Sequence, residues 1–140
     1  MKIDKFNGEG YKDITAYEAL VNIENEQMEV RKAAKFRPLV YICSPYSGDI
    51  DNNTKKAQLY SRFAVDNGAV PLAVHLLFPQ YMSEKHERDL ALSMGIAVLG
   101  KCKEVWVFGE DVSEGMVYEI GRAKKMGKTI RYFTEELEEV

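Results

Sequence analysis

Short apolar segments alternate with helical segments along most of this chain. Four of them have the composition of buried strands, at residues 39–43, 69–74, 104–109 and 128–133. Three intervening segments have the apolar spacing of helices, at residues 51–67, 84–101 and 113–126. Strands that alternate with helices form a parallel sheet with right-handed crossovers. The sequence therefore predicts an α/β fold, with a parallel sheet of four to five strands and helices on both faces.

The ends of these elements carry recognisable signals. Asp51 or Asn53 is expected to cap the first of the three helices, and Ser113 to cap the last. Residues 75–83 are expected to form a loop or short turn, because Pro79 interrupts an apolar run. The acidic residues 135–139 are expected to form an exposed helix end.

A charged helix is predicted before the first strand. Residues 13–15 can cap it, apolar residues recur at helical spacing as far as Lys35, and Pro38 ends it. The sequence thus predicts a helical extension at 1–37 and an α/β domain at 38–140. The extension either covers the domain or a partner subunit, or it docks another protein.

Composition excludes several classes of function. The chain has 140 residues, a formal net charge of −3 and a pI near 5.5, which argues against binding to nucleic acid or to a membrane surface. No apolar run is long enough to span a bilayer, and the N-terminus does not resemble a signal peptide. The two cysteines, Cys43 and Cys102, are expected to be reduced, and no residues have zinc-ligand spacing. We therefore expect a cytoplasmic protein without a metal site.

Open parallel sheets bind ligands at the carboxyl ends of their strands, which here precede the segments 44–50, 75–83 and 109–115. The first segment includes Ser44, Tyr46, Ser47 and Gly48, and leads into a helix whose free N–H groups suit a phosphate. It contains neither a dinucleotide fingerprint nor a P-loop. The alternative to phosphate binding is that this segment is a plain connection.

A carboxylate follows the third of these segments. Ser113 and Gly115 open a helix, and Glu119 lies one turn later, where it can face the carboxyl edge of the sheet. Beside a sugar, a carboxylate at this point can act as a nucleophile. The alternative is an ordinary surface glutamate.

Two stretches of sequence resemble the nucleoside 2-deoxyribosyltransferase superfamily. They are Tyr41-Ile42-Cys43-Ser44-Pro45 and Val117-Tyr118-Glu119-Ile120-Gly121-Arg122-Ala123, and the resemblance extends over roughly residues 38–133. It is strongest to 2′-deoxynucleoside 5′-phosphate N-hydrolases and to uncharacterised bacterial and phage proteins. It implies a Rossmann-like, flavodoxin-like sheet, cleavage of an N-glycosidic bond without metal or organic cofactor, and a nucleoside or nucleotide substrate. Because family members share sites across dimers, it also implies a homo-oligomer.

The resemblance assigns roles to individual residues. Glu119 matches the nucleophile that attacks the sugar C1′, and Tyr41 matches a tyrosine near the sugar. Ser47 and Gly48 match a phosphate-binding loop, and Ser113 and Gly115 match a Ser and a Gly at the same offsets before the nucleophile.

The sequence also departs from the family. Ser44 stands where a glycine is usual, and the position of a second family carboxylate falls at Gly95 or Ile96. The nearest acid, Asp89, lies six or seven residues earlier, a shift of about 10 Å along a helix. Asp89 and His75 remain candidate acids, although His75 can also be structural, and Tyr46 can stack on a base.

Three functions therefore stay open from the sequence. The chain is an N-glycosidase or deoxyribosyltransferase-like enzyme, a nucleotide-binding protein without catalysis, or an interaction module with a vestigial site.

Overall fold

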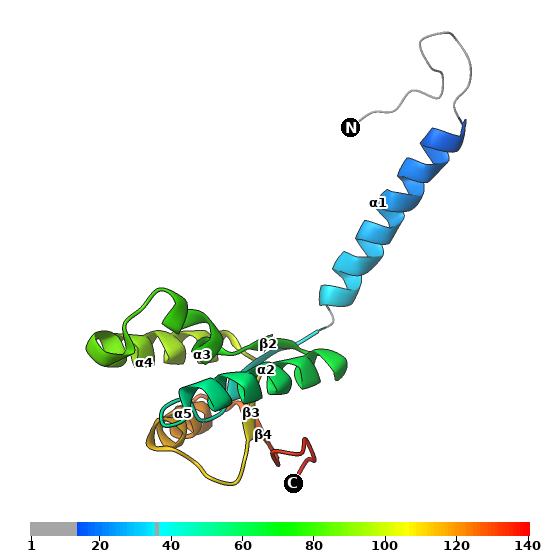
Figure 1. The fold of residues 1–140 in the computed structure, drawn as a ribbon. Coiled ribbons are helices and arrows are strands. Elements are labelled where there is room, and N and C mark those ends of the chain that lie inside the picture. The colour runs from blue at the N-terminus through cyan, green and yellow to red at the C-terminus, as the bar shows by residue number, and fades with distance from the viewer. Residues whose placement is uncertain (1–13, 36) are drawn as a thin grey trace. The chain divides into compact units, whose positions relative to one another are not determined.

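The computed structural model describes residues 14–35 and 37–140 (Figure 1). The chain divides into two units, residues 1–37 and 38–140, which are described separately. In the first unit, helix α1 spans Ile14–Lys35. The expected cap at Asp13 lies outside the described residues. None of the described helices combines the length and the apolar character that a bilayer crossing requires.

A four-stranded parallel sheet forms the centre of the second unit. Its strands are β1 (Leu39–Cys43), β2 (Val70–Leu72), β3 (Glu104–Phe108) and β4 (Thr129–Phe133). Their order across the sheet is β2-β1-β3-β4, and every neighbouring pair is parallel. The predicted α/β fold class is confirmed, although β2 is shorter than the expected segment 69–74.

Helices cover both faces of this sheet. They are α2 (Ile50–Asp66), α3 (Val74–Leu77), the 3-10 helix η1 (Phe78–Gln80), α4 (Glu84–Lys101) and α5 (Glu114–Lys125). The step from β1 to β2 runs across the sheet in the direction opposite to the steps from β2 to β3 and from β3 to β4. Because parallel crossovers are right-handed, α2 lies on one face, and α4 and α5 lie on the other.

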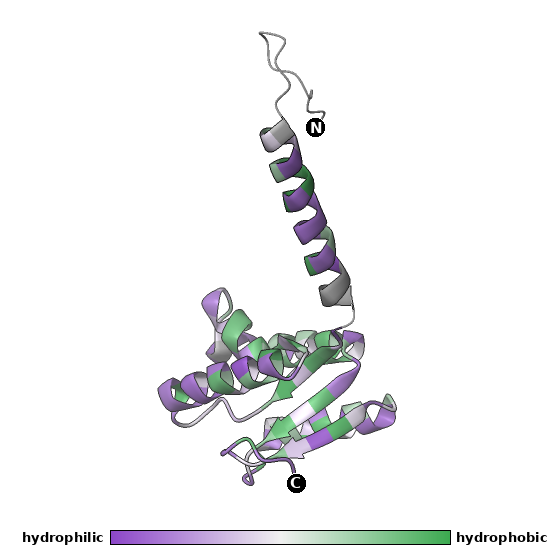
Figure 2. Cartoon of the chain, turned by 90° about the vertical axis from the view of Figure 1, so that its right-hand side faces the viewer, coloured by the Kyte–Doolittle hydropathy of each residue, from purple (hydrophilic) through white to green (hydrophobic). Residues whose placement is uncertain are grey.

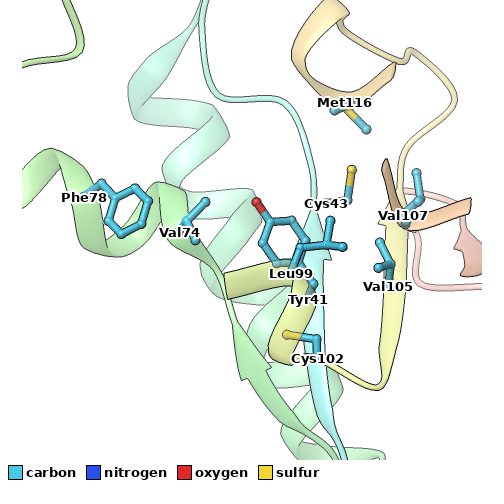
Figure 3. Packing of buried hydrophobic residues seen from close by; sticks show 10 residues of the cluster. Tyr41, Cys43, Val74, Phe78, Leu99, Cys102, Val105, Val107 and Met116 are labelled. Atoms are coloured by element: carbon cyan, nitrogen blue, oxygen red, sulfur yellow. The ribbon is translucent and has the colours of Figure 1, made fainter. Parts of the chain in front are cut away.

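The alternation of side chains along β1 and β3 divides the core into two clusters. Val40 and Ile42 pack toward α2 in a cluster rich in aromatic rings, where Tyr60 stacks on Phe108 with ring centroids 4.3 Å apart. Tyr41 and the other side chains that point the opposite way form the second cluster, drawn in Figure 3, with Cys43, Val74, Leu99, Val105, Val107 and Met116. This second cluster continues into the cavity described below.

Two local expectations are wrong at the start of α2 and after β2. The N-cap of α2 is Asp49, whose Oδ1 accepts a hydrogen bond from the Asn52 amide at 3.3 Å, and not Asp51 or Asn53. Asn53 instead donates to the carbonyls of Tyr46 and Ser47 at 3.0 and 3.1 Å, and so fixes the loop before the helix. Residues 74–80 form helical turns. Pro79 does not prevent this, because it lies in the first turn of η1, where a missing N–H is tolerated.

The C-terminal tail is also not the helix end that its composition predicts. It folds back as a turn, with an antiparallel bridge between Phe133 and Glu139. The Glu139 carboxylate pairs with the Arg131 guanidinium at 2.7 and 2.8 Å, and Arg131 lies over the Trp106 ring. This bidentate, charge-assisted pair joins residues eight positions apart and holds the tail back against β4.

The packing of α4 against β1 gives a first prediction. Leu99 is fully buried, whereas Leu90 on the same helix is 52% exposed. Leu99→Ala should lower the free energy of unfolding by about 2–5 kcal/mol, and Leu90→Ala should change it by less than about 0.5 kcal/mol. Urea unfolding followed by the fluorescence of Trp106 measures both. Equal losses in the two variants would contradict the described packing of α4.

Candidate active site

Helix α5 carries a carboxylate on its core-facing side. Its buried residues are Met116, Glu119 and Ala123, at the spacing i, i+3 and i+7 of one helix face. Glu119 is 5% exposed, and its Oε2 atom has no hydrogen-bond partner among the described residues. An unpaired carboxylate on an otherwise apolar helix face lowers stability, so its burial points to a functional role.

Two residues of β1 lie against this carboxylate. The hydroxyl of Tyr41 and the thiol of Cys43 interact with Glu119 and lower its pKa, but burial has the larger effect and raises the pKa from 4.5 to about 7. The Tyr41 Oη atom makes no hydrogen bond of good geometry within the described residues. Burial also raises the pKa of Tyr41 and of Cys43, so both groups are protonated at pH 7. Glu119 thus has two potential donors beside it.

Glu119 and Tyr41 line a cavity of about 120 Å³ at the carboxyl edge of the sheet. This volume is well above the minimum that holds one water molecule. The wall combines apolar and polar groups from α3, η1, α4, α5 and the loop after β1. Its members are Tyr41, Tyr46, Ser47, Val74, His75, Phe78, Pro79, Met82, Arg88, Ala91, Leu92, Gly95, Ser113, Gly115, Met116 and Glu119.

Seven of the ten residues proposed from the sequence line this cavity: Tyr41, Tyr46, Ser47, His75, Ser113, Gly115 and Glu119. The structure therefore brings together residues from β1 and the loop after it, from α3, and from α5 and its N-cap. Ser44, Gly48 and Asp89 are not among the lining residues.

Ser44 and Gly48 lie beside the cavity wall in the loop before α2. Ser44 is 2% exposed, and its backbone forms a hydrogen bond with His75. Gly48 has a φ of +97°, a conformation that a residue with a side chain rarely adopts. Both residues shape the loop that presents Ser47 to the cavity.

His75 is held as a neutral imidazole. Its ring stacks on Tyr46 with centroids 4.9 Å apart. Burial lowers the pKa of His75 to about 4, and the hydrogen bond to the Ser44 backbone opposes this shift only in part. At pH 7 the ring is therefore uncharged, and it holds little of the protonated form that a general acid needs.

Helix α4 presents one regular face to the cavity. Arg88, Ala91, Leu92 and Gly95 have the spacing i, i+3, i+4 and i+7, and all line the wall. Asp89 is about 100° around the helix from Arg88 and is exposed to solvent. The residue seven positions before Gly95 is Arg88, so the helix brings a cation to this wall and does not bring Asp89.

At Gly95 the backbone of α4 comes close to Tyr41. A Cβ atom placed on Gly95 would lie 3.4 Å from Tyr41 Oη and 3.8 Å from Val74 Cγ2. Of the two positions that the family resemblance allows for a second carboxylate, Gly95 lines the cavity and Ile96 is not among the lining residues. Among the described residues that line the wall, Glu119 is the one carboxylate.

The sequence did not lead us to expect Arg88 in the cavity wall. Arg88 was not among the proposed site residues, although it shares a helix face with Gly95. The spacing of residues 88, 91, 92 and 95 is the signal that indicates this face.

Comparison with solved structures identifies the fold. A 2-deoxyribosyltransferase from Leishmania mexicana superposes with a TM-score of 0.52 at 18% identity, over 69% of this chain and 64% of that enzyme. A 2-deoxyribosyltransferase from Bacillus psychrosaccharolyticus superposes with a TM-score of 0.50 at 18% identity, over 69% of this chain and 72% of that one. The second unit thus has the α/β fold of 2-deoxyribosyltransferases, and the chain spans less than two thirds of the Leishmania enzyme.

The family is established by sequence. Residues 38–133 match the family described as domain of unknown function DUF7768, and the chain belongs to this family. The match covers all four strands and leaves out α1. No curated protein sequence matches the chain.

The buried carboxylate gives a prediction on stability. The Glu119 carboxyl has a pKa of about 7 when folded and an ordinary value of 4.5. Below pH 4.5 it is protonated in both states; as the pH rises to 7, the unfolded chain releases a proton that the folded chain retains. Stability should therefore fall over this range, by about 3 kcal/mol.

Glu119→Gln removes this titration. The variant should exceed the parent in free energy of unfolding at pH 8, and the difference should shrink toward pH 4. Urea unfolding at the two pH values measures it, with exposed Glu110 as the site of the control variant Glu110→Gln. A difference that does not change with pH would show that Glu119 has an ordinary pKa.

Proposed function

We propose that the α/β unit binds a deoxynucleoside or its monophosphate in this cavity and cleaves the N-glycosidic bond with Glu119 as the nucleophile. The observation that carries the proposal is the Glu119 Oε2 atom, which is buried beside Tyr41 Oη without a partner in a cavity wall. Buried polar atoms in folded proteins nearly always have partners. A ligand that enters the cavity can supply the missing ones.

The carboxylate suits attack on a sugar. In its ionised form, an Oε atom of Glu119 adds to C1′ as the bond from C1′ to the base nitrogen breaks. The base keeps the electron pair of that bond and takes a proton from water, so the products are a glycosyl ester and the free base. Water then attacks C1′ and releases the sugar and the carboxylate, as in retaining glycosidases. Attack by a second base in place of water gives transfer, which is the reaction named for both structural relatives.

Tyr41 controls the nucleophile. Its pKa is raised by burial, so its hydroxyl stays protonated and is available as a donor to the Glu119 carboxylate. Such a donor favours the ionised form and orients it. As the ester forms, Glu119 loses its negative charge, and the Tyr41 hydroxyl becomes available to the sugar.

The remaining wall suits the rest of the substrate. Ser113 caps α5 by accepting a hydrogen bond from the Met116 amide at 3.3 Å, and Gly115 leaves the start of this helix uncovered. With Ser47 across the cavity, these groups offer donors to a sugar hydroxyl or a phosphate. Tyr46 and Phe78 offer flat surfaces for a base.

Base release tests the proposal. The protein is incubated with a panel of deoxynucleosides and their 5′-monophosphates, and free base is measured by chromatography. Glu119→Gln should lower the rate by at least about a thousandfold, because the nucleophile is lost. Glu110→Gln, an exposed change of the same kind, should keep the parental rate.

The pH profile is part of the same test. Because the ionised carboxylate attacks, kcat/KM should rise with pH to a plateau, with an apparent pKa near that of Glu119, about 7. Release that survives in Glu119→Gln, or a rate that falls as the pH rises from 5 to 7, would contradict the assigned role.

Binding without catalysis is a second candidate, and one observation favours it. The resemblance places a second carboxylate at Gly95 or Ile96, neither of which can protonate a leaving base, and the described wall holds no carboxylate besides Glu119. This candidate predicts that calorimetry detects nucleotide binding to the parent, that no base is released from any member of the panel, and that Glu119→Gln still binds.

A further inference from the structure

Helix α1 lies outside the matched family and carries a regular apolar seam. Its members follow one another at spacings of four, three, four and three residues: Ala16, Leu20, Ile23, Gln27 and Val30. This is the spacing of the a and d positions of a heptad repeat, in which helices pack side by side. Figure 2 shows green hydrophobic bands along an otherwise mostly purple α1.

Two large residues of the seam are exposed in the described structure. Val30 is 69% exposed and Ile23 is 48% exposed, although both are large aliphatic residues. A groove along the helix is lined by Ile23, Glu26, Gln27, Val30 and Arg31. In heptad terms these are d, g, a, d and e positions, the set that surrounds a knob from a facing helix.

Charge complementarity indicates which helix fits this groove. With Gln27 at an a position, Glu26 is at g and Arg31 is at the following e. In a parallel pair, a g residue faces the e residue five positions later on the other helix. Glu26 of one copy therefore faces Arg31 of a second copy, and the same pair forms on the other side of the seam.

The polar residue in the seam favours the same arrangement. A single polar side chain at an a position fixes register, because any shift would bury it against an apolar neighbour. Two Gln27 amides that face each other can each donate and accept a hydrogen bond. Moreover, most helical stability in proteins comes from the packing of an apolar face, so packing against a partner stabilises α1.

The pattern points to a second copy of this chain as the partner: we infer that α1 forms a parallel, in-register, two-stranded coiled coil through the seam. The α/β units of a dimer are then joined through their N-terminal sides. The inference rests on α1 alone and is independent of the proposed reaction.

Dimer dissociation tests the seam. Val30→Glu places a charge at a d position and should raise the dissociation constant of the full chain at least tenfold in sedimentation velocity. Met28→Glu is the matched control, because Met28 is 52% exposed but lies at a b position, away from the seam. Its constant should stay within about threefold of the parent. Equal constants for the two variants would overturn the inference.

Cross-linking tests orientation and register. Equivalent d positions adjoin in a parallel pair, so Val30→Cys should form an intermolecular disulfide when copper phenanthroline and oxygen take up the two electrons and two protons. Met28→Cys should not, and the native Cys43 and Cys102 are buried. No disulfide from Val30→Cys, or equal yields from both variants, would overturn the proposed arrangement.

Exchange of charges tests the paired residues. Glu26→Lys and Arg31→Glu should each weaken the dimer, and the double variant should recover most of the parental affinity. A double variant weaker than either single variant would show that these residues do not face each other.

Discussion

The parallel pairing of β1 with β3 is the interaction on which the candidate site depends. These strands are neighbours in space but are separated in sequence by α2, β2, α3, η1 and α4. The connections from their carboxyl ends lead to opposite faces of the sheet, to α2 after β1 and to α5 after β3. Such a reversal leaves a crevice at the end of the sheet. Tyr41 from β1 and Glu119 from α5 meet there, and α4 closes one wall.

The site lowers the stability of the fold that holds it. Burial raises the pKa of Glu119 to about 7. When this carboxyl group is ionised, it therefore lowers the free energy of unfolding of the chain. The surrounding core offsets this cost, because Val105, Val107 and Leu99 are fully or almost fully buried on the same face. The same burial strengthens the interaction of the carboxylate with Tyr41.

The sequence predicted those parts of the structure that depend on local pattern. The strands have apolar runs, and Glu119 follows a helix cap at a fixed offset, so both were visible without coordinates. The full extent of α4 was predicted too, but the kink at Glu87, where the backbone is not helical, was not. Arg88 lines the cavity and Asp89 does not, because Arg88 shares a helix face with Gly95. The C-terminal turn was missed because the Arg131–Glu139 pair is a tertiary contact.

The most direct test of the account is to look for the covalent intermediate on Glu119. A deoxynucleoside that reacts slowly is incubated with the protein, the reaction is stopped with acid, and the digested protein is analysed by mass spectrometry. The account predicts one added deoxyribosyl group on the peptide that contains Glu119, and none in Glu119→Gln. Release of base with no adduct, or an adduct on another residue, would contradict Glu119 as the nucleophile.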